Sequence, residues 1–164
     1  EKFGSLRGIS IAFVGDGYNV ARSLAYASVM SRMHIKIASP VGYQLDPSVV
    51  ELANSLAGDG TVFQLTDPYE AVTDVAAVYT DVWASMGQED EMALRAEAFA
   101  SYQVNSELMS AAPPDALVMH DLPAHHGEEI TRDVFEGRNS IIFDQAENRL
   151  FTTQAALKYM FNVN

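Results

Sequence analysis

The feature that most constrains the fold is a continuous apolar run, "GISIAFVG" at residues 8–15, which ends in glycine. Apolar residues at consecutive positions are typical of a strand that is buried on both faces, as in the centre of a parallel sheet. The following segment, residues 16–33, places Ala21 and Ala25 at helical spacing, which lets a helix pack closely on a sheet. A buried strand followed by such a helix indicates a β-α unit.

The same alternation continues along the whole chain. Further segments suited to strands are residues 34–40, 61–66, 75–83, 115–120 and 140–145. Helical patterns occupy residues 46–57, 67–74, 88–104, 106–114 and 147–161. We therefore expect an α/β protein with three layers, α/β/α, built on a Rossmann-like parallel sheet of five or more strands.

Composition limits the functions that the chain can have. Its 164 residues suffice for one domain with a sizeable core. The formal net charge of -12 argues against nucleic-acid binding, which needs a basic face. Because cysteine is absent, disulfides, thiolate metal sites and cysteine nucleophiles are excluded. The sequence has no apolar run long enough to span a bilayer and no signal peptide, so we expect a cytoplasmic protein without a membrane partner.

Polar loops follow four of the expected strands. They are "GDGYNV" (15–20), "TDVWASMGQ" (80–88), "HDLPAHHGEE" (120–129) and "DQAENR" (144–149). Ligands of parallel α/β sheets bind at the carboxyl ends of the strands, so these loops are expected to form one site at one rim. An amide or a guanidinium at this rim suits an anionic or carbonyl oxygen, and a carboxylate suits an amine. The candidates are Asn19, Asp81, His120 and Arg149.

A dinucleotide site is a weaker interpretation of the first loop. Gly15 and Gly17 have the G-x-G spacing, but Val20 stands at the third glycine position of the fingerprint. The strand at residues 34–40 also ends without the carboxylate that would bind a ribose. A tight turn with Asn19 as the cap of the next helix explains the same residues.

A metal site is a weaker interpretation of the loop at residues 120–129, although this loop holds three histidines and three carboxylates. Zinc-binding histidines of the H-E-x-x-H type share one helix face, whereas Pro123 and Gly127 prevent a helix here. Adjacent His125 and His126 rarely converge on one ion. We therefore favour His120 as a hydrogen-bond donor to a polar substrate.

Taken together, "VGDGYNVARS", "YTDVWASMGQE", "MHDLPAHHGEE" and "FDQAENRL" resemble the motifs of ornithine carbamoyltransferases, in the same order. The resemblance covers residues 6–161, and "DVWASMG" is its most specific element, because the Ser-Met-Gly loop separates ornithine enzymes from aspartate enzymes. The family has two α/β domains, of which the first binds carbamoyl phosphate through a Ser-x-Arg-Thr-Arg motif that this sequence lacks. The resemblance implies that residues 1–164 are a single ornithine-binding domain and that the carbamoyl-phosphate-binding domain is absent from this chain.

The resemblance also implies an activity and partners. In the family, the δ-amine of L-ornithine attacks the carbamoyl carbon of carbamoyl phosphate, giving L-citrulline and phosphate, without a metal or an organic cofactor. The implied partners are L-ornithine, carbamoyl phosphate held by the other domain, and further copies in a homotrimer. The last helix, residues 147–161, would pack on the first domain and would lack that surface here.

Roles of individual residues follow by position in the resembling motifs. Asn19 and Asp81 would hold the α-carboxylate and the α-amine of ornithine. The resemblance implies that Ser85 and Met86 close over ornithine. It implies that His120 and Arg149 contact the carbamoyl group, and that the backbone carbonyl of Leu122 faces the reacting amine.

Asp121 is the main departure from the family pattern, which has cysteine at this position. A carboxylate beside the reacting δ-amine raises the pKa of that amine and keeps it protonated. Our hypothesis is that Asp121 tightens ornithine binding as a counter-ion and slows the reaction; the alternative is that it faces solvent or caps the loop. His126 and Tyr18 also depart, from the usual arginine and asparagine.

Two other functions stay open at this point. One is an amino-acid-binding module without catalysis, because the ornithine half of the site is retained and the phosphate half is missing. The other is an oxidoreductase of similar fold, which the broken G-x-G-x-x-G pattern disfavours. In either case the isolated chain is expected to be inactive as a carbamoyltransferase.

Overall fold

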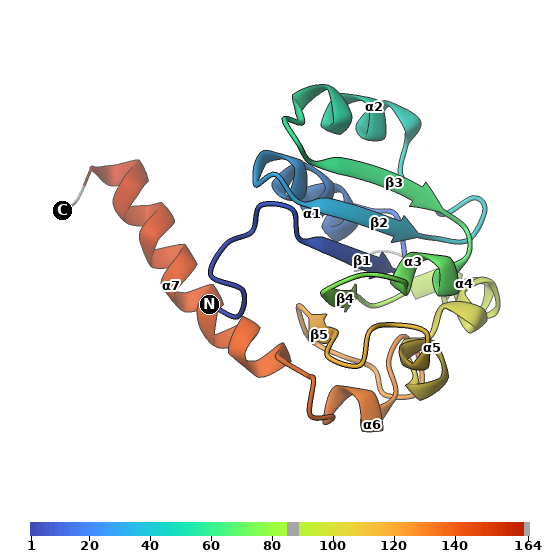
Figure 1. The fold of residues 1–164 in the computed structure, drawn as a ribbon. Helices are drawn as coiled ribbons and strands as arrows, with labels where there is room; N and C mark the ends of the chain where they lie inside the picture. The colour runs from blue at the N-terminus through green and yellow to red at the C-terminus, as the bar shows by residue number, and fades with distance from the viewer. Residues whose placement is uncertain (85–88, 163–164) are drawn as a thin grey trace.

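The computed structural model describes residues 1–84 and 89–162. Within them, parallel strands form a five-stranded sheet of order β3-β2-β1-β4-β5 (Figure 1). The strands are β1 (Ser10–Val14), β2 (His34–Ala38), β3 (Thr61–Leu65), β4 (Ala77–Thr80) and β5 (Leu117–His120). The parallel sheet expected from the sequence is confirmed.

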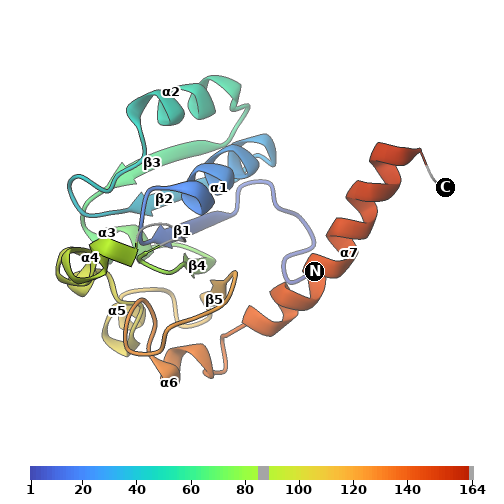
Figure 2. The ribbon, with the colours of Figure 1, turned by 180° about the vertical axis from the view of Figure 1, so that it is seen from behind.

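Helices cover both faces of the sheet (Figures 1 and 2). The helices are α1 (Asn19–Met30), α2 (Pro47–Leu56), α3 (Pro68–Val72), α4 (Met92–Phe99), α5 (Ser106–Ser110), α6 (Arg132–Phe135) and α7 (Ile142–Phe161). Successive residues of β1 point to opposite faces: Ile11 and Phe13 join one core with α1 and α2, and Ala12 and Val14 join the other with α3 to α6. Short 3₁₀ helices, η1 (Glu89–Glu91) and η2 (Ala100–Tyr102), flank α4. The three-layer arrangement is therefore confirmed.

Local chemistry explains where several of these elements begin. The side chains of Asp46 and Asp67 accept hydrogen bonds from the backbone N–H two residues later, each at 2.8 Å, and a proline follows each aspartate. Gly17 lies so close to the segment after β2 that a Cβ atom would stand 2.3 Å from the backbone nitrogen of Leu45. The G-x-G spacing thus serves packing between two loops of this chain.

Two sequence expectations about local structure were wrong. Residues 140–145 do not form a sixth strand: Ser140 makes only an isolated bridge with Val118, and α7 begins at Ile142. A short apolar run suits a strand and a buried helix start equally well, and this run is the latter. Asn19 is not the cap of α1, because the helix begins at Asn19 after Tyr18, and no side chain caps it.

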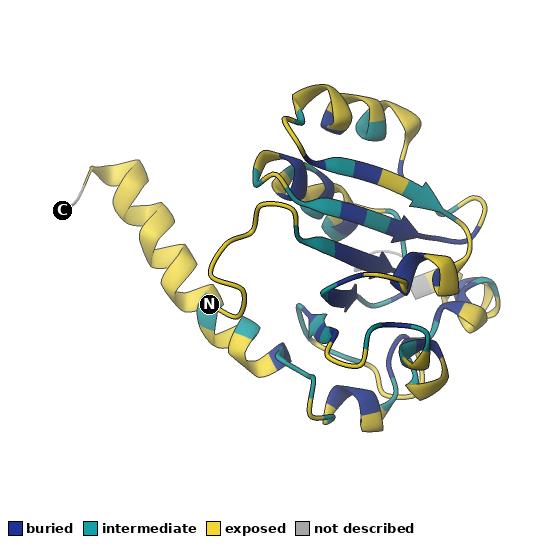
Figure 3. Cartoon of the chain, viewed as in Figure 1, coloured by how far each residue is buried: buried dark blue, intermediate teal, exposed yellow. Residues whose placement is uncertain are grey.

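Helix α7 extends away from the sheet, and its outer turns are exposed (Figure 3). Leu150, Leu157 and Phe161 are all exposed, the last by 70%. The first turns of α7 are tied to the N-terminal segment, where Lys2 Nζ lies 2.8 Å from Asp144 Oδ2. Between α7, the N-terminal segment, α1 and the sheet lies a cavity of about 620 Å³, which is lined mainly by apolar side chains.

Candidate functional site

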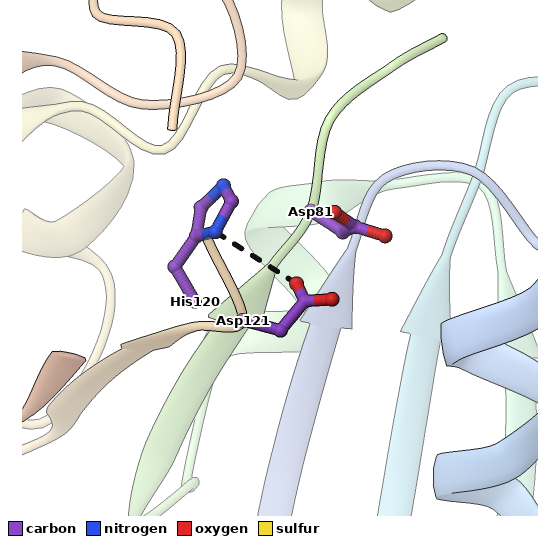
Figure 4. Close-up of side chains that lie close together, drawn as sticks. All are labelled: Asp81, His120 and Asp121. Carbon is purple, nitrogen blue, oxygen red and sulfur yellow. Dashed lines mark ion pairs between the residues drawn. The ribbon is translucent and has the colours of Figure 1, made fainter. Parts of the chain in front are cut away.

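The site lies where β4 and β5 end side by side. Thr80 pairs with His120 in the parallel register, so Asp81 and Asp121 follow at the same rim. Carboxylate oxygens of both aspartates and a ring nitrogen of His120 lie within 4.8 Å of one another (Figure 4). The loop after β1 is adjacent, since a Cβ atom on Gly15 would be 3.7 Å from the carbonyl oxygen of Asp81. The structure therefore brings the predicted loops after β1, β4 and β5 together.

Asp81 is a carboxylate in an unfavourable electrostatic environment. Its Oδ1 accepts a hydrogen bond of 2.7 Å from the Val82 N–H. Burial, and next the negative charge of Asp121, raise the pKa of Asp81 to about 7. Asp121 Oδ1 is buried without a hydrogen-bond partner among the described residues. An ammonium group placed between the two carboxylates would relieve both problems, so the pair suits an amine ligand.

This environment predicts that Asp81→Asn stabilises the chain at alkaline pH. A carboxylate whose folded pKa is raised destabilises the fold fully above that value, and this penalty disappears as the pH falls from about 7 to about 4. The shift sets an upper bound of about 4 kcal/mol, which solvent screening reduces to about 1–2 kcal/mol because Asp81 is only part-buried. Urea unfolding at pH 8 should show this gain, and unfolding at pH 4 should show almost none. A gain that is equal at both pH values would contradict the prediction.

His120 is fully buried, and its ring is held from both sides. Nδ1 accepts a hydrogen bond of 2.8 Å from the Leu122 N–H, so Nε2 carries the proton and donates to Glu129 Oε1 at 3.1 Å. Leu122 adopts a positive φ of 62°, which is uncommon for a residue with a side chain. In this conformation His120 fixes the backbone of Leu122, and its predicted contact with a substrate stays a prediction.

Sequence reasoning missed two residues that support this loop. Glu129 is fully buried and accepts a second hydrogen bond, of 2.6 Å, from the His125 N–H. Gln145, in the first turn of α7, accepts from the His120 N–H at 3.1 Å and donates to the Tyr79 hydroxyl at 2.9 Å. A glutamate beside Glu128 in a polar loop carries no signal that it turns inward, and the apolar pattern at residues 140–145 predicts a strand that includes Gln145.

The other predicted residues lie around this centre. Arg149, on α7, lines the cavity described above together with Asp121 and Tyr79. It also lines a hollow on the other side of the loop with Leu122 and Pro123. Asn19 is exposed in the first turn of α1, with its Oδ1 2.9 Å from the Val20 N–H. Ser85 and Met86 lie outside the described residues.

The fold and the rim define a class of protein: a Rossmann-like domain with paired carboxylates at its strand ends, suited to a small amine-bearing ligand. A family model described as "Aspartate/ornithine carbamoyltransferase, Asp/Orn binding domain" matches residues 7–160. The chain belongs to this family, and it corresponds to the family's second domain.

Individual relatives agree with this assignment. The ornithine carbamoyltransferase of Symbiobacterium thermophilum is 52% identical over 159 residues, which are 96% of this chain and 51% of that protein. That of Acidothermus cellulolyticus is 49% identical over 99% of this chain and 53% of that protein. The solved structure of the Pyrococcus furiosus enzyme superposes with a TM-score of 0.90 at 45% identity, covering 96% of this chain and 51% of that one. The chain thus spans about half the length of the curated relatives it matches.

Within the described residues, no helix combines the length and apolar character needed to cross a membrane.

Proposed function

We propose that this chain is the ornithine-binding domain of an ornithine carbamoyltransferase and acts with a carbamoyl-phosphate-binding domain. The proposal includes the cytoplasmic location and homotrimeric assembly expected from the resemblance. The observation that carries it is the carboxylate pair of Asp81 and Asp121 beside the His120–Leu122 loop. The relatives named ornithine carbamoyltransferase support the choice of ornithine among amine ligands.

In the proposed complex, the α-carboxylate of ornithine lies at the start of α1 near the Asn19 amide, where helix N–H groups favour an anion. The α-ammonium group lies at Asp81. Asp121 is close enough to Asp81 to share the α-ammonium group, so we place Asp121 there as a second counter-ion, and not beside the reacting δ-amine, where the sequence hypothesis places it. The predicted contact of Ser85 and Met86 with the substrate stays a prediction, because both lie outside the described residues.

The proposed reaction involves the loop at residues 120–122 and Arg149 on α7. The δ-amine, once neutral, attacks the carbamoyl carbon; a C–N bond forms, the bond to the phosphate oxygen breaks, and the proton that the attacking nitrogen loses leaves with the phosphate. The Leu122 carbonyl accepts a hydrogen bond from the attacking amine, and its position depends on the bond between the Leu122 N–H and His120. Arg149 contacts the carbamoyl group, where a guanidinium stabilises the oxygen on which charge develops. The contact predicted for His120 requires one ring nitrogen to give up its bond to Leu122 or Glu129.

Titration of the chain with L-ornithine, followed by NMR, tests this proposal. We expect binding on the order of millimolar, near -4 kcal/mol, with shifts at the strand ends of β4 and β5. Asp121→Cys should weaken binding by about tenfold, because a charge-assisted contact is lost. Putrescine, which lacks the α-carboxylate, should bind more weakly than ornithine. Equal affinities of the unmodified chain and Asp121→Cys for ornithine would show that Asp121 does not face the ammonium group. If ornithine caused no NMR shifts at the rim, the proposed site would be wrong.

A further inference from the structure

A second group of potential ligand atoms lies beyond the substrate loop, in the turn at residues 125–129. Its members are His125, Glu128 and Glu129, whose imidazole nitrogen and carboxylate oxygens lie within 4.8 Å of one another. His125 Nδ1 is 3.8 Å from Glu129 Oε2. The turn is closed by a hydrogen bond of 3.0 Å from the Glu128 N–H to the His125 carbonyl oxygen. His125 and Glu128 are exposed, whereas Glu129 is fully buried.

The two oxygens of Glu129 have very different surroundings. Oε1 accepts hydrogen bonds from the His120 ring and the His125 N–H. Oε2 is buried and has no hydrogen-bond partner among the described residues. An ionised carboxylate oxygen that is buried without a partner is costly, and such groups are normally paired or bound to a metal. Oε2 is therefore a buried acceptor without a hydrogen-bond donor, and the imidazole of His125 and the carboxylate of Glu128 lie next to it.

We propose that His125, Glu128 and Glu129 bind a divalent transition metal ion such as Zn²⁺. One imidazole and two carboxylates form a ligand set that suits zinc and disfavours Mg²⁺ and Ca²⁺, which prefer oxygen ligands alone. Tetrahedral ligands at about 2.1 Å from the metal lie about 3.4 Å apart. The exposed side chains of His125 and Glu128 can close the remaining distance to the fixed Glu129, and water would complete the coordination.

Neighbouring groups make this the favoured metal site at the rim. His126 does not compete, because its ring packs edge-on against Phe135 with centroids 4.7 Å apart. The cluster of Asp81, His120 and Asp121 is less suited, because the ring nitrogens of His120 already bond to Leu122 and Glu129. Only the turn at residues 125–129 combines an accessible imidazole with an unpartnered buried carboxylate oxygen within the part of the chain that the structure describes.

The site is coupled to the substrate loop through Glu129. A metal on Oε2 would hold the carboxylate in place and draw electron density from Oε1, the acceptor of the His120 Nε2–H bond. His120 in turn positions the backbone of Leu122. Metal occupancy would therefore act on the geometry of this loop, which is a regulatory link between two sites on one chain. The inference does not depend on the identity of the substrate.

Calorimetric titration of the purified chain with ZnCl₂ tests the site. We expect one ion per chain, and an increase in the melting temperature with Zn²⁺ that Mg²⁺ does not produce. His125→Ala and Glu128→Gln should each weaken binding by at least about tenfold. The matched controls His126→Ala and Glu136→Gln, an adjacent histidine and an exposed glutamate, should bind as the unmodified chain does.

NMR spectra of the imidazole nitrogens give a readout of the coupling. Zn²⁺ should shift the His125 Nδ1 signal strongly and the His120 Nε2 signal measurably, and should leave His34 unchanged. Absence of Zn²⁺ binding, equal loss in His126→Ala, or binding that persists in His125→Ala but is lost in Asp121→Asn each overturns the proposal. Binding with the expected losses but no shift at His120 overturns the link to the substrate loop.

Discussion

The purified 164-residue chain, mixed with L-ornithine and carbamoyl phosphate, is expected to form no measurable citrulline. Holding two reactants together lowers a barrier by about 7–11 kcal/mol, and under the proposed function this chain binds ornithine but does not hold the phosphate of the second substrate. Departure of phosphate also needs cationic groups on its oxygens, and the Ser-x-Arg-Thr-Arg motif that supplies them in the family does not occur in the sequence. A colorimetric citrulline assay with a heat-inactivated control measures the result.

Fusion to a carbamoyl-phosphate-binding domain provides the complementary experiment. We expect turnover when residues 1–164 follow the first half of the Symbiobacterium thermophilum enzyme, which shares 52% identity with this chain over the second half. Asp81→Ala in the fusion should abolish it, whereas Arg132→Met, at an exposed position on α6, should not. Turnover by the chain alone contradicts the inactivity prediction. A fusion that binds both ornithine and carbamoyl phosphate without turnover favours the amino-acid-binding module instead.

The arrangement of the sheet could be predicted because it depends on patterns that are local in sequence. Continuous apolar runs separated by helical periodicity indicate parallel strands, and parallel strands place the residues that follow them at one rim. This pattern predicts that Asp81 and His120 lie at the same rim, as the register of β4 and β5 confirms. It failed at residues 140–145, because three apolar residues have no periodicity that separates a strand from a buried helix start.

The internal contacts of the site could not be predicted, because they depend on tertiary structure. The sequence predicts His120 as a hydrogen-bond donor to a substrate, yet its two ring nitrogens are hydrogen-bonded to Glu129 and to the Leu122 N–H. Its partner Glu129 is indistinguishable in sequence from the exposed Glu128. Arg95 lies in the helical pattern at residues 88–104, which gives no sign that the arginine is buried, although only 6% of it is exposed.

Arg95 contacts the three loops that follow β1, β2 and β4. Its Nη1 lies 2.6 Å from Asp16 Oδ2 and donates to the Trp83 carbonyl oxygen at 2.9 Å. Its Nε bonds to Glu91 Oε2 at 3.0 Å, and its guanidinium lies 4.9 Å from the centre of the Tyr43 ring. Asp16 and Trp83 belong to the loops after β1 and β4, so this one cation connects the two loops that hold Asn19 and Asp81.

Replacement of Arg95 by methionine should therefore destabilise the chain by about 3–5 kcal/mol, because it leaves the Asp16 carboxylate buried without its cation. Burial already raises the pKa of Asp16, and Arg95 opposes that effect. Without Arg95 the pKa of Asp16 rises further, so the folded state takes up a proton more readily and the variant regains stability as the pH falls from 8 towards 5. Guanidinium unfolding at both pH values measures this.

The double variant Arg95→Met/Asp16→Asn separates the charge effect from lost packing. It should recover most of the loss, because no unpaired charge remains, and the difference in stability between it and the unmodified chain should be nearly the same at pH 8 and pH 5. Arg132→Met is the matched control: that arginine is exposed, its ion pair with Glu136 spans 3.5 Å, and its loss should cost less than about 1 kcal/mol. A loss below about 1 kcal/mol for Arg95→Met itself, or an equal loss in the double variant, would mean that the buried charge of Asp16 does not depend on Arg95.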